Sequence, residues 1–213
     1  MQVYADPITV NCRKVLAGLE FLDIEYQLEP VNYMAGEHAQ EPYLTLNPNA
    51  SLPALKDGDF VLWESNAILQ YAADKAGRDA QYPREPQARA DVNRWLLWES
   101  SAWFPSCYTY LVENCVKPMM GGAADAEVLA AEAVRFHKLA GILDARLREQ
   151  AWLCGAAPTI ADIAVAAPMH VHGPAGLLLD DYPNLRRWMS DNVEALPAWQ
   201  ATAGPVDAAF SAG

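Results

Sequence analysis

The hydrophobic pattern changes once along this chain of 213 residues, and the change limits the folds that the chain can adopt. Residues 1–78 alternate strand-like and helical runs in the order βαβ, a linking helix, and ββα. This order predicts an α/β domain around a mixed four-stranded sheet. Residues 79–86 are polar and contain proline, which is typical of a linker. Residues 87–213 carry only helical periodicity and predict an all-α domain.

Local signals place several elements of the first part. Strand-like runs at residues 54–56 and 60–63 straddle Asp57-Gly58, a dipeptide that favours a tight hairpin turn. A looser helix is expected over residues 41–46. A further helix is expected from about residue 66 to residue 76, with Ser65 as its N-terminal cap.

Apolar stripes define the helices of the second part. One long stripe covers residues 92–103, and Pro105 predicts a kink after it. A second stripe covers residues 129–147. Thr159 and Asp162 have the spacing of a capping box, which predicts the start of a third helix and a folding role for Asp162.

Composition excludes several classes of partner. Asp and Glu outnumber Lys and Arg by 27 to 15, which gives a net charge of −12 and disfavours nucleic acid and anionic membranes. No apolar run approaches the roughly 20 residues needed to cross a bilayer, and the first residues carry no secretory signal. We therefore expect a cytoplasmic protein. The cysteines form no C-x-x-C pair, so no metal is expected; they are Cys12, Cys107, Cys115 and Cys154.

A carboxylate and a hydroxyl stand side by side where the helix after the hairpin is expected to begin. An α-amino acid carries an ammonium and a carboxylate close together. Glu64 can pair with the ammonium, and the Ser65 hydroxyl and the following helix N–H groups can hold the carboxylate. The dipeptide therefore predicts a site for an amino-acid zwitterion. Alternatively, Ser65 only caps the helix and Glu64 only favours its dipole.

Pro53 adds a second binding element. If Leu52-Pro53 is cis, the N–H and C=O of Leu52 can turn outward and pair with an extended peptide. A peptide backbone and a free α-amino acid end together describe a small peptide. Glutathione fits this description, because its γ-linked glutamate keeps both charged groups free.

The stretch GEHAQEPYLTLNPNASLPALKDGDFVLWESNAILQYAADKAG resembles the glutathione-binding half of soluble glutathione transferases, near bacterial members of the phi and theta classes. The resemblance covers the whole chain, because PTIADI and YPNLRRW resemble the helical domain of the same superfamily. It implies a thioredoxin-like domain, an all-α domain, a homodimer, and glutathione as co-substrate.

Matched by position, the resemblance also implies the parts of a glutathione site. Glu64 and Ser65 resemble the γ-glutamyl site, and His38 resembles the residue that reaches the glycyl carboxylate. Leu52 and Pro53 resemble the cysteinyl-backbone site. A departure is found beside them at Ser51, where relatives often carry Gln or Lys; weaker glutathione affinity is expected from the shorter side chain.

The candidate for thiol activation lies between the first strand and the first helix. A helix N-terminus favours a thiolate, and a hydroxyl that donates to the sulfur lowers its pKa further. Alignment on CRKV places Thr9 at the activating position, and Thr9-x-Asn11 resembles the nu class, in which both residues face the sulfur. Tyr4 is an alternative that lies within the strand, and Thr9 is also a possible plain helix cap.

Cys12 offers a rival mechanism. A thiol in the first helical turn, beside Arg13 and Lys14, is a candidate for a lowered pKa and for a glutathione-dependent thiol reductase. A non-catalytic binding protein on the same fold is a third possibility. The preferred interpretation is a transferase or peroxidase, in which an activated glutathione thiolate attacks an electrophile or a peroxide.

The helical part is expected to contain a second-substrate pocket, and it also contains a pair of histidines that resembles a metal site. By family position, a pocket for a hydrophobic or aromatic electrophile is lined by Trp103, Phe104, Cys107 and Tyr108. His170 and His172 are two residues apart, which points them to different sides of a helix. A structural role is therefore favoured for this pair.

Overall fold

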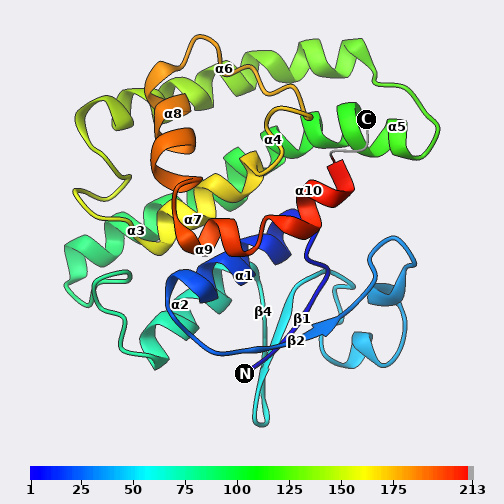
Figure 1. Cartoon of the computed structure of the whole chain (residues 1–213), viewed down its shortest axis with the longest axis vertical. Helices are drawn as coiled ribbons and strands as arrows, with labels where there is room; N and C mark the ends of the chain where they lie inside the picture. The colour runs from blue at the N-terminus through cyan, green and yellow to red at the C-terminus, as the bar shows by residue number, and fades with distance from the viewer. Residues whose placement is uncertain (211–213) are drawn as a thin grey trace.

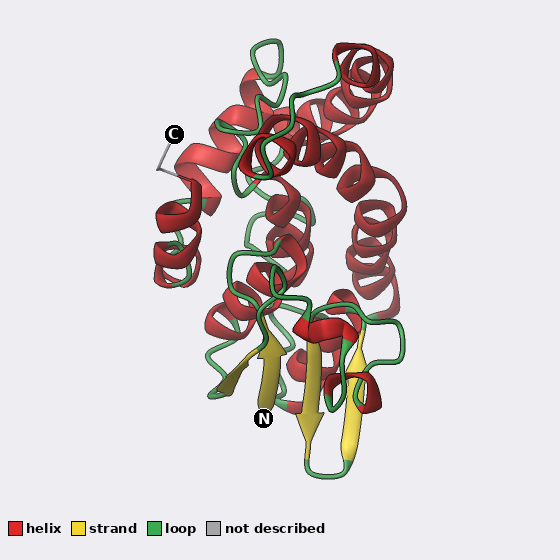
Figure 2. Ribbon diagram, turned by 90° about the vertical axis from the view of Figure 1, so that its right-hand side faces the viewer, coloured by secondary structure: helices red, strands yellow, loops and turns green. Residues whose placement is uncertain are grey.

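The computed structural model describes residues 1–210, with a sheet-containing part at one end and a helical part at the other (Figures 1 and 2). The first part contains β1 (Gln2–Ala5), α1 (Val10–Phe21), β2 (Gln27–Pro30), β3 (Ala54–Asp57), β4 (Phe60–Trp63) and α2 (Ser65–Lys75). The main helices of the second part are α3 (Pro86–Trp98), α4 (Phe104–Leu111), α5 (Lys117–Met119), α6 (Ala126–Glu149), α7 (Ile160–Ala166), α8 (Pro183–Arg187), α9 (Pro197–Ala201) and α10 (Gly204–Phe210).

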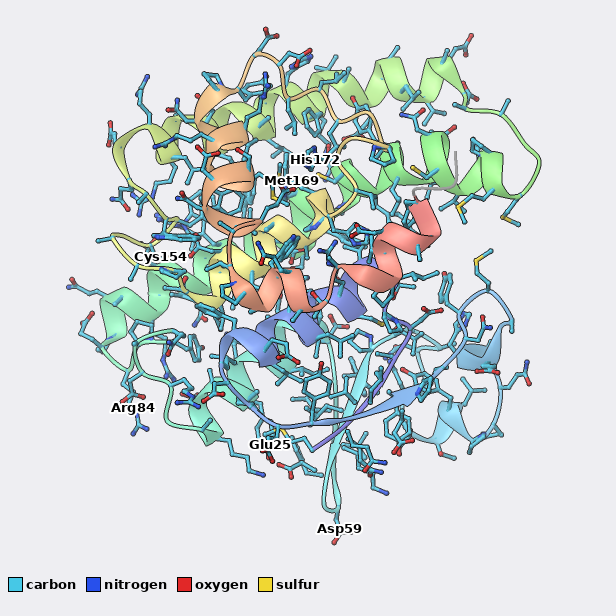
Figure 3. All side chains as sticks on the ribbon, viewed as in Figure 1. Glu25, Asp59, Arg84, Cys154, Met169 and His172 are labelled. Atoms are coloured by element: carbon cyan, nitrogen blue, oxygen red, sulfur yellow. The ribbon has the colours of Figure 1, made fainter. Side chains whose placement is uncertain are left out.

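The sheet is mixed and has the strand order β2-β1-β3-β4. β1 runs parallel to β2 and antiparallel to β3, and β3 pairs with β4 in the predicted hairpin. Gly58 adopts a positive φ of 63° in the turn, and Asp59 marks the tip of the hairpin (Figure 3). A thioredoxin-like domain followed by an all-helical part confirms the predicted fold class.

α1 is the central helix of the molecule, between the sheet and the helical part (Figure 1). It contacts α2 on the sheet side and α7 and α9 on the other. Its approach to α2 is close: a Cβ on Gly18 would lie 2.2 Å from Leu69 Cδ2. The helix is buried along most of its length, and the buried residues include the charged side chains of Arg13 and Lys14.

Two predictions in the first part are wrong in detail. The helix expected at residues 41–46 is only the 3₁₀ turn Tyr43–Thr45, because Pro42 and Pro48 leave room for a single turn between them. The prediction that Ser65 caps α2 is also wrong. Glu64 holds the N-cap position, and Ser65 is the first helical residue, with its hydroxyl bonded elsewhere.

The interruption predicted near Pro105 takes the form of a π-helical turn, Glu99–Trp103, that joins α3 to α4. A π turn inserts one extra residue and rotates the following helix face by about 100°.

The capping box at α7 is confirmed, with Thr159 and Asp162 bonded reciprocally. α5 and α10 were not anticipated. No helix in the described part of the chain combines the length and the apolar character that crossing a membrane requires.

Candidate active site

The turn between β1 and α1 is organised by Asp6. Its carbonyl accepts hydrogen bonds from the Thr9 N–H and from Thr9 Oγ1, both at 3.0 Å. Its carboxylate accepts from the backbone N–H groups of Ile8 (3.3 Å) and Tyr33 (2.9 Å). Because Tyr33 lies in the loop that leads to His38, one residue fixes both the start of α1 and that loop.

Thr9 occupies the N-cap position of α1, but its side chain accepts no hydrogen bond from a helix N–H. Its hydroxyl therefore does not work as a plain helix cap. The first N–H groups of a helix have no intrahelical partner, and the helix dipole favours negative charge beside them. The start of α1 thus offers N–H groups and a partly exposed hydroxyl to an anion.

Cys12 lies further into α1 and is fully buried. Burial raises the pKa of its thiol to about 12, and a hydrogen bond with Thr9 offsets only part of this rise. Arg13 and Lys14 were expected to lower the pKa of the Cys12 thiol, but they do not, because both cations are buried and contact other groups. Arg13 lies 4.5 Å from the ring centroid of Trp199, and Lys14 forms a buried ion pair. The structure therefore disfavours Cys12 as a nucleophile.

The loop before β3 contains Leu52 and Pro53, the two residues expected to hold a peptide backbone. The Leu52-Pro53 bond is cis. Within residues 1–210 the N–H and C=O of Leu52 form no hydrogen bond. The preceding residue, Ser51, is anchored through its carbonyl, which accepts from the Tyr43 hydroxyl (2.5 Å) and from Asn47 Nδ2 (2.8 Å). A fixed loop with a free peptide group can pair with an extended peptide.

The start of α2 lies beside the start of α1. Glu64 is exposed and adopts a φ of 73° and a ψ of 108°, a backbone conformation that costs a non-glycine residue about 1–3 kcal/mol and concentrates at ligand sites. Ser65 Oγ accepts a hydrogen bond from Lys14 Nζ (3.1 Å) and donates one to Asn11 Oδ1 (3.3 Å). This last bond brings the Glu64 and Ser65 pair together with the turn that carries Thr9.

His38 lies in the 3₁₀ turn Glu37–Ala39 and stacks on Tyr33, with ring centroids 4.4 Å apart. Its Nδ1 is buried and has no hydrogen-bond partner among the described residues. The connection of His38 to the rest of the site runs through Tyr33 and Asp6. Its contact with a glycyl carboxylate stays a prediction.

The expected second-substrate pocket loses two of its residues. Trp103 is fully buried and its indole N–H donates to a backbone carbonyl of α7, and Cys107 is fully buried in the same core. Both side chains pack into the hydrophobic core instead of lining an open surface. Phe104 and Tyr108 are partly exposed and stacked, with centroids 5.2 Å apart. Burial raises the pKa of Tyr108, and the neighbouring Tyr33 hydroxyl adds to the rise.

His170 and His172 have different surroundings. Burial lowers the pKa of His170 to about 3, and the nearby Arg13 charge contributes to this shift. His172 lies in the helical part (Figure 3), with Nε2 3.1 Å from Glu194 Oε1. Among residues 1–210, no group of three or more His, Cys, Asp or Glu side chains is arranged to hold a metal ion.

Comparison with known proteins gives a consistent result. The glutathione S-transferase N-terminal domain model matches residues 2–74, and the C-terminal domain model matches residues 107–197. A glutathione S-transferase from Hyoscyamus muticus is 32% identical over 205 residues, which cover 93% of this chain and 95% of that protein. The chain belongs to the glutathione S-transferase family. The transferase interpretation is thereby favoured over a thiol reductase and over a non-catalytic binding protein.

Solved structures of this glutathione S-transferase family have the same architecture. A theta-class enzyme from Xanthomonas axonopodis pv. citri with glutathione bound superimposes with a TM-score of 0.86 at 28% identity, over 95% of this chain and 96% of that chain. Glutathione S-transferase I from maize, in complex with an atrazine glutathione conjugate, gives a TM-score of 0.85 at 28% identity, over 97% of each chain.

Three residues that support the candidate site were not assigned to it from the sequence: Asp6, Lys14 and Glu99. A signal existed for Lys14, because a cation inside an otherwise apolar helical stripe needs a buried partner. Asp6 precedes a proline, which is a turn signal. Glu99 carried no local signal, since its partner lies far away in the sequence.

Proposed function

We propose that this chain binds glutathione between the starts of α1 and α2 and activates its sulfur at Thr9. The observation that carries the proposal is the Ser65–Asn11 hydrogen bond (3.3 Å), which ties together the two helix N-termini. Both N-termini favour an anion, and a glutathione molecule has a carboxylate and a thiolate to place beside them.

Each part of glutathione has a proposed partner. Glu64 pairs with the ammonium of the γ-glutamyl group, and Ser65 donates to its carboxylate. Leu52 pairs with the cysteinyl backbone, supported by Ser51 and Pro53. His38 reaches the glycyl carboxylate. Thr9 donates to the sulfur, and Asn11 supplies a second amide near it, since only its oxygen is used by Ser65.

The second substrate is proposed to be a hydrophobic or aromatic electrophile. Phe104 and Tyr108 form a stacked pair that suits a planar or apolar group. In conjugation the thiolate forms a carbon–sulfur bond while the leaving group departs with the bonding electrons. No metal is part of the proposed reaction.

The proposal is tested by assaying one preparation with chloronitrobenzenes, organic peroxides and glutathionyl disulfides. We expect retention on immobilised glutathione and turnover of at least one of the first two classes. If the protein is not retained and shows no thermal shift with glutathione, the proposal fails in favour of a non-catalytic protein. Turnover of disulfides alone, abolished in Cys12→Ala, would favour the reductase mechanism.

We also propose a homodimer. Large apolar side chains remain exposed on the edge strand β4 and on α3, which is typical of an interface; they include Phe60, Trp63 and Leu97. Sedimentation at low micromolar concentration is expected to give about twice the chain mass of 23.4 kDa. Phe60→Ser is expected to shift this equilibrium toward monomer, and a monomer in the unmodified protein would refute the proposal.

The remaining assignments belong to the same proposal. The domain boundaries are residues 1–78 and 87–213, of which the structure describes residues up to 210, with a linker at 79–86. A subclass near the phi, theta and nu-like bacterial enzymes is supported by Thr9-x-Asn11. The cytoplasmic location is supported by free, mostly buried cysteines. The net charge of −12 supports the absence of nucleic-acid and membrane partners.

A further inference from the structure

An ion pair is buried between the sheet-containing part and the helical part. Lys14 on α1 and Glu99 in the π turn are 1% and 0% exposed, and their Nζ and Oε2 atoms are 2.8 Å apart. Burying two charges has a large desolvation cost, and a pair of apolar side chains is often no less stable. Stability is therefore a weak explanation for this pair, and its surroundings show a second role.

The ammonium group of Lys14 also contacts the glutathione site. Its Nζ lies 3.1 Å from Ser65 Oγ. An ammonium group can only donate, so the serine oxygen must accept this bond, and its single O–H must point elsewhere. In the structure the O–H points to Asn11 Oδ1. Lys14 thus keeps the Ser65 hydroxyl oriented as a donor.

Glu99 in turn fixes Lys14. Its Oε2 accepts from Lys14 Nζ and from Asn66 Nδ2 (3.0 Å), and Asn66 Nδ2 also donates to the Leu96 carbonyl (2.8 Å). α2 therefore contacts the carboxylate directly through Asn66, and the Leu96 carbonyl of α3 fixes Asn66 in turn. The chain of contacts runs from the helical part to Ser65 without an exposed link.

We propose that Lys14 and Glu99 are positioning residues for glutathione binding, which act by fixing the Ser65 hydroxyl as a donor toward the γ-glutamyl carboxylate. This inference rests on the proposed role of Ser65. Neither residue touches glutathione in the proposal, and their effect reaches the ligand through one hydroxyl. Loss of that orientation should weaken glutathione binding more than it lowers the turnover rate of the enzyme with glutathione bound.

The test compares Lys14→Met, Lys14→Met/Glu99→Leu and the unmodified protein by KM for glutathione, kcat and Tm. Lys14→Met leaves a buried carboxylate without its partner, so a large loss of stability is expected. The double variant removes both charges and is expected to regain most of the Tm. In both variants the KM for glutathione is expected to rise about tenfold, with a smaller change in kcat at saturation.

Arg13→Met is the matched control. Arg13 is the neighbouring buried cation on α1, and it contacts the His170 carbonyl and Trp199 rather than Ser65. Its loss is expected to lower Tm and to leave the KM for glutathione within about twofold. If Arg13→Met raises KM as much as Lys14→Met does, the effect is a general loss of packing in α1 and the inference is overturned.

Ser65→Ala separates this inference from the proposed function. If Ser65→Ala leaves the KM for glutathione unchanged, the assigned role of Ser65 fails and this inference fails with it. If Ser65→Ala raises KM but the double variant does not, only the Lys14 and Glu99 inference fails. In a Ser65→Ala background, the Lys14→Met/Glu99→Leu change is expected to add less than about twofold, because both act through the same hydroxyl.

If the double variant does not fold, Lys14→Arg tests whether Lys14 orients the Ser65 hydroxyl. Arginine keeps the charge beside Glu99, but its planar fork cannot reproduce the single ammonium donor at Ser65. A raised KM with a nearly unchanged Tm supports the inference. An unchanged KM in a folded Lys14→Arg protein overturns it.

Discussion

Replacing Asp162 with alanine is expected to lower the free energy of unfolding by about 3–4 kcal/mol, because buried donors lose the only acceptor that they have among residues 1–210. Its carboxylate is fully buried. Oδ1 accepts from the Leu153 N–H (2.8 Å), and Oδ2 accepts from the N–H (2.8 Å) and the hydroxyl (3.1 Å) of Thr159. One side chain therefore closes the capping box of α7 and fixes the preceding loop.

The position of α7 increases the effect. Every residue of this helix is buried, and it contacts both α1 and α3. A frayed first turn would therefore expose apolar surface in the centre of the molecule. Thermal unfolding should show one transition at a clearly lower Tm, with little change in glutathione affinity once the variant is folded.

The effect of Asp162→Ala on stability is also expected to depend on pH. Burial raises the pKa of Asp162 to about 6, although hydrogen bonds from Leu153 and Thr159 lower it. Between about pH 4 and pH 6, the Asp162 carboxyl is therefore protonated in the native state and ionised in the unfolded state. The contribution of this carboxyl is greatest below that window and falls as pH rises through 6. We expect Asp162→Ala to cost about 1 kcal/mol more at pH 5.5 than at pH 7.5.

Two control variants make the measurement specific. Asp180 is fully exposed, so Asp180→Ala is expected to change stability by no more than about 0.5 kcal/mol. Asp162→Asn keeps the shape but turns an NH₂ group toward a backbone N–H, so it should lose much of the same stability. A variant Asp162→Ala that keeps its Tm but no longer binds glutathione would assign this residue to the site instead.

Local chemistry made much of the fold predictable. Asp57-Gly58 between two short apolar runs produced the β3–β4 hairpin, and Thr159 with Asp162 produced the start of α7. These signals act between residues a few positions apart, so a sequence reveals them directly. The helix expected at residues 41–46 is a single 3₁₀ turn, because Pro42 and Pro48 flank this short segment.

Tertiary contacts decided the parts of the site that could not be predicted. Ser65 looked like a helix cap, but its hydroxyl is bonded to Lys14, which is 51 positions away. Family position places Trp103 and Cys107 in a pocket, but both are fully buried, and the Trp103 indole donates to a backbone carbonyl of α7. The partner of the Trp103 indole is the Val165 carbonyl, 62 positions away, so no local pattern marks this burial.

Replacing Thr9 with valine is expected to reduce turnover near neutral pH by about 10–100-fold. Valine keeps the branched shape and removes the hydroxyl. Because the Thr9 side chain caps no helix N–H, α1 should keep its structure. The hydroxyl donates to the Asp6 carbonyl at 3.0 Å, and rotation of its O–H can direct it to a sulfur instead. The variant therefore tests sulfur activation with little change in the fold.

The expected mechanism is a change in the thiol pKa. A hydrogen bond to a charged acceptor contributes about 1.5–3 kcal/mol, so its loss should raise the pKa of bound glutathione by about 1–2 units. Thiolate absorbance of bound glutathione, titrated against pH, measures this shift directly. Glutathione affinity should change less than turnover, because Leu52, Glu64 and Ser65 do not depend on Thr9.

Thr9→Ser and Cys12→Ala complete the comparison. Serine keeps the hydroxyl and is expected to retain most of the turnover and the low thiol pKa. Cys12 is buried with a thiol pKa of about 12, so its removal should leave conjugation largely intact. An active Thr9→Val protein together with an inactive Cys12→Ala protein would contradict this assignment and indicate a thiol reductase. The distinction needs no knowledge of the natural electrophile, because the absorbance titration reports on glutathione itself.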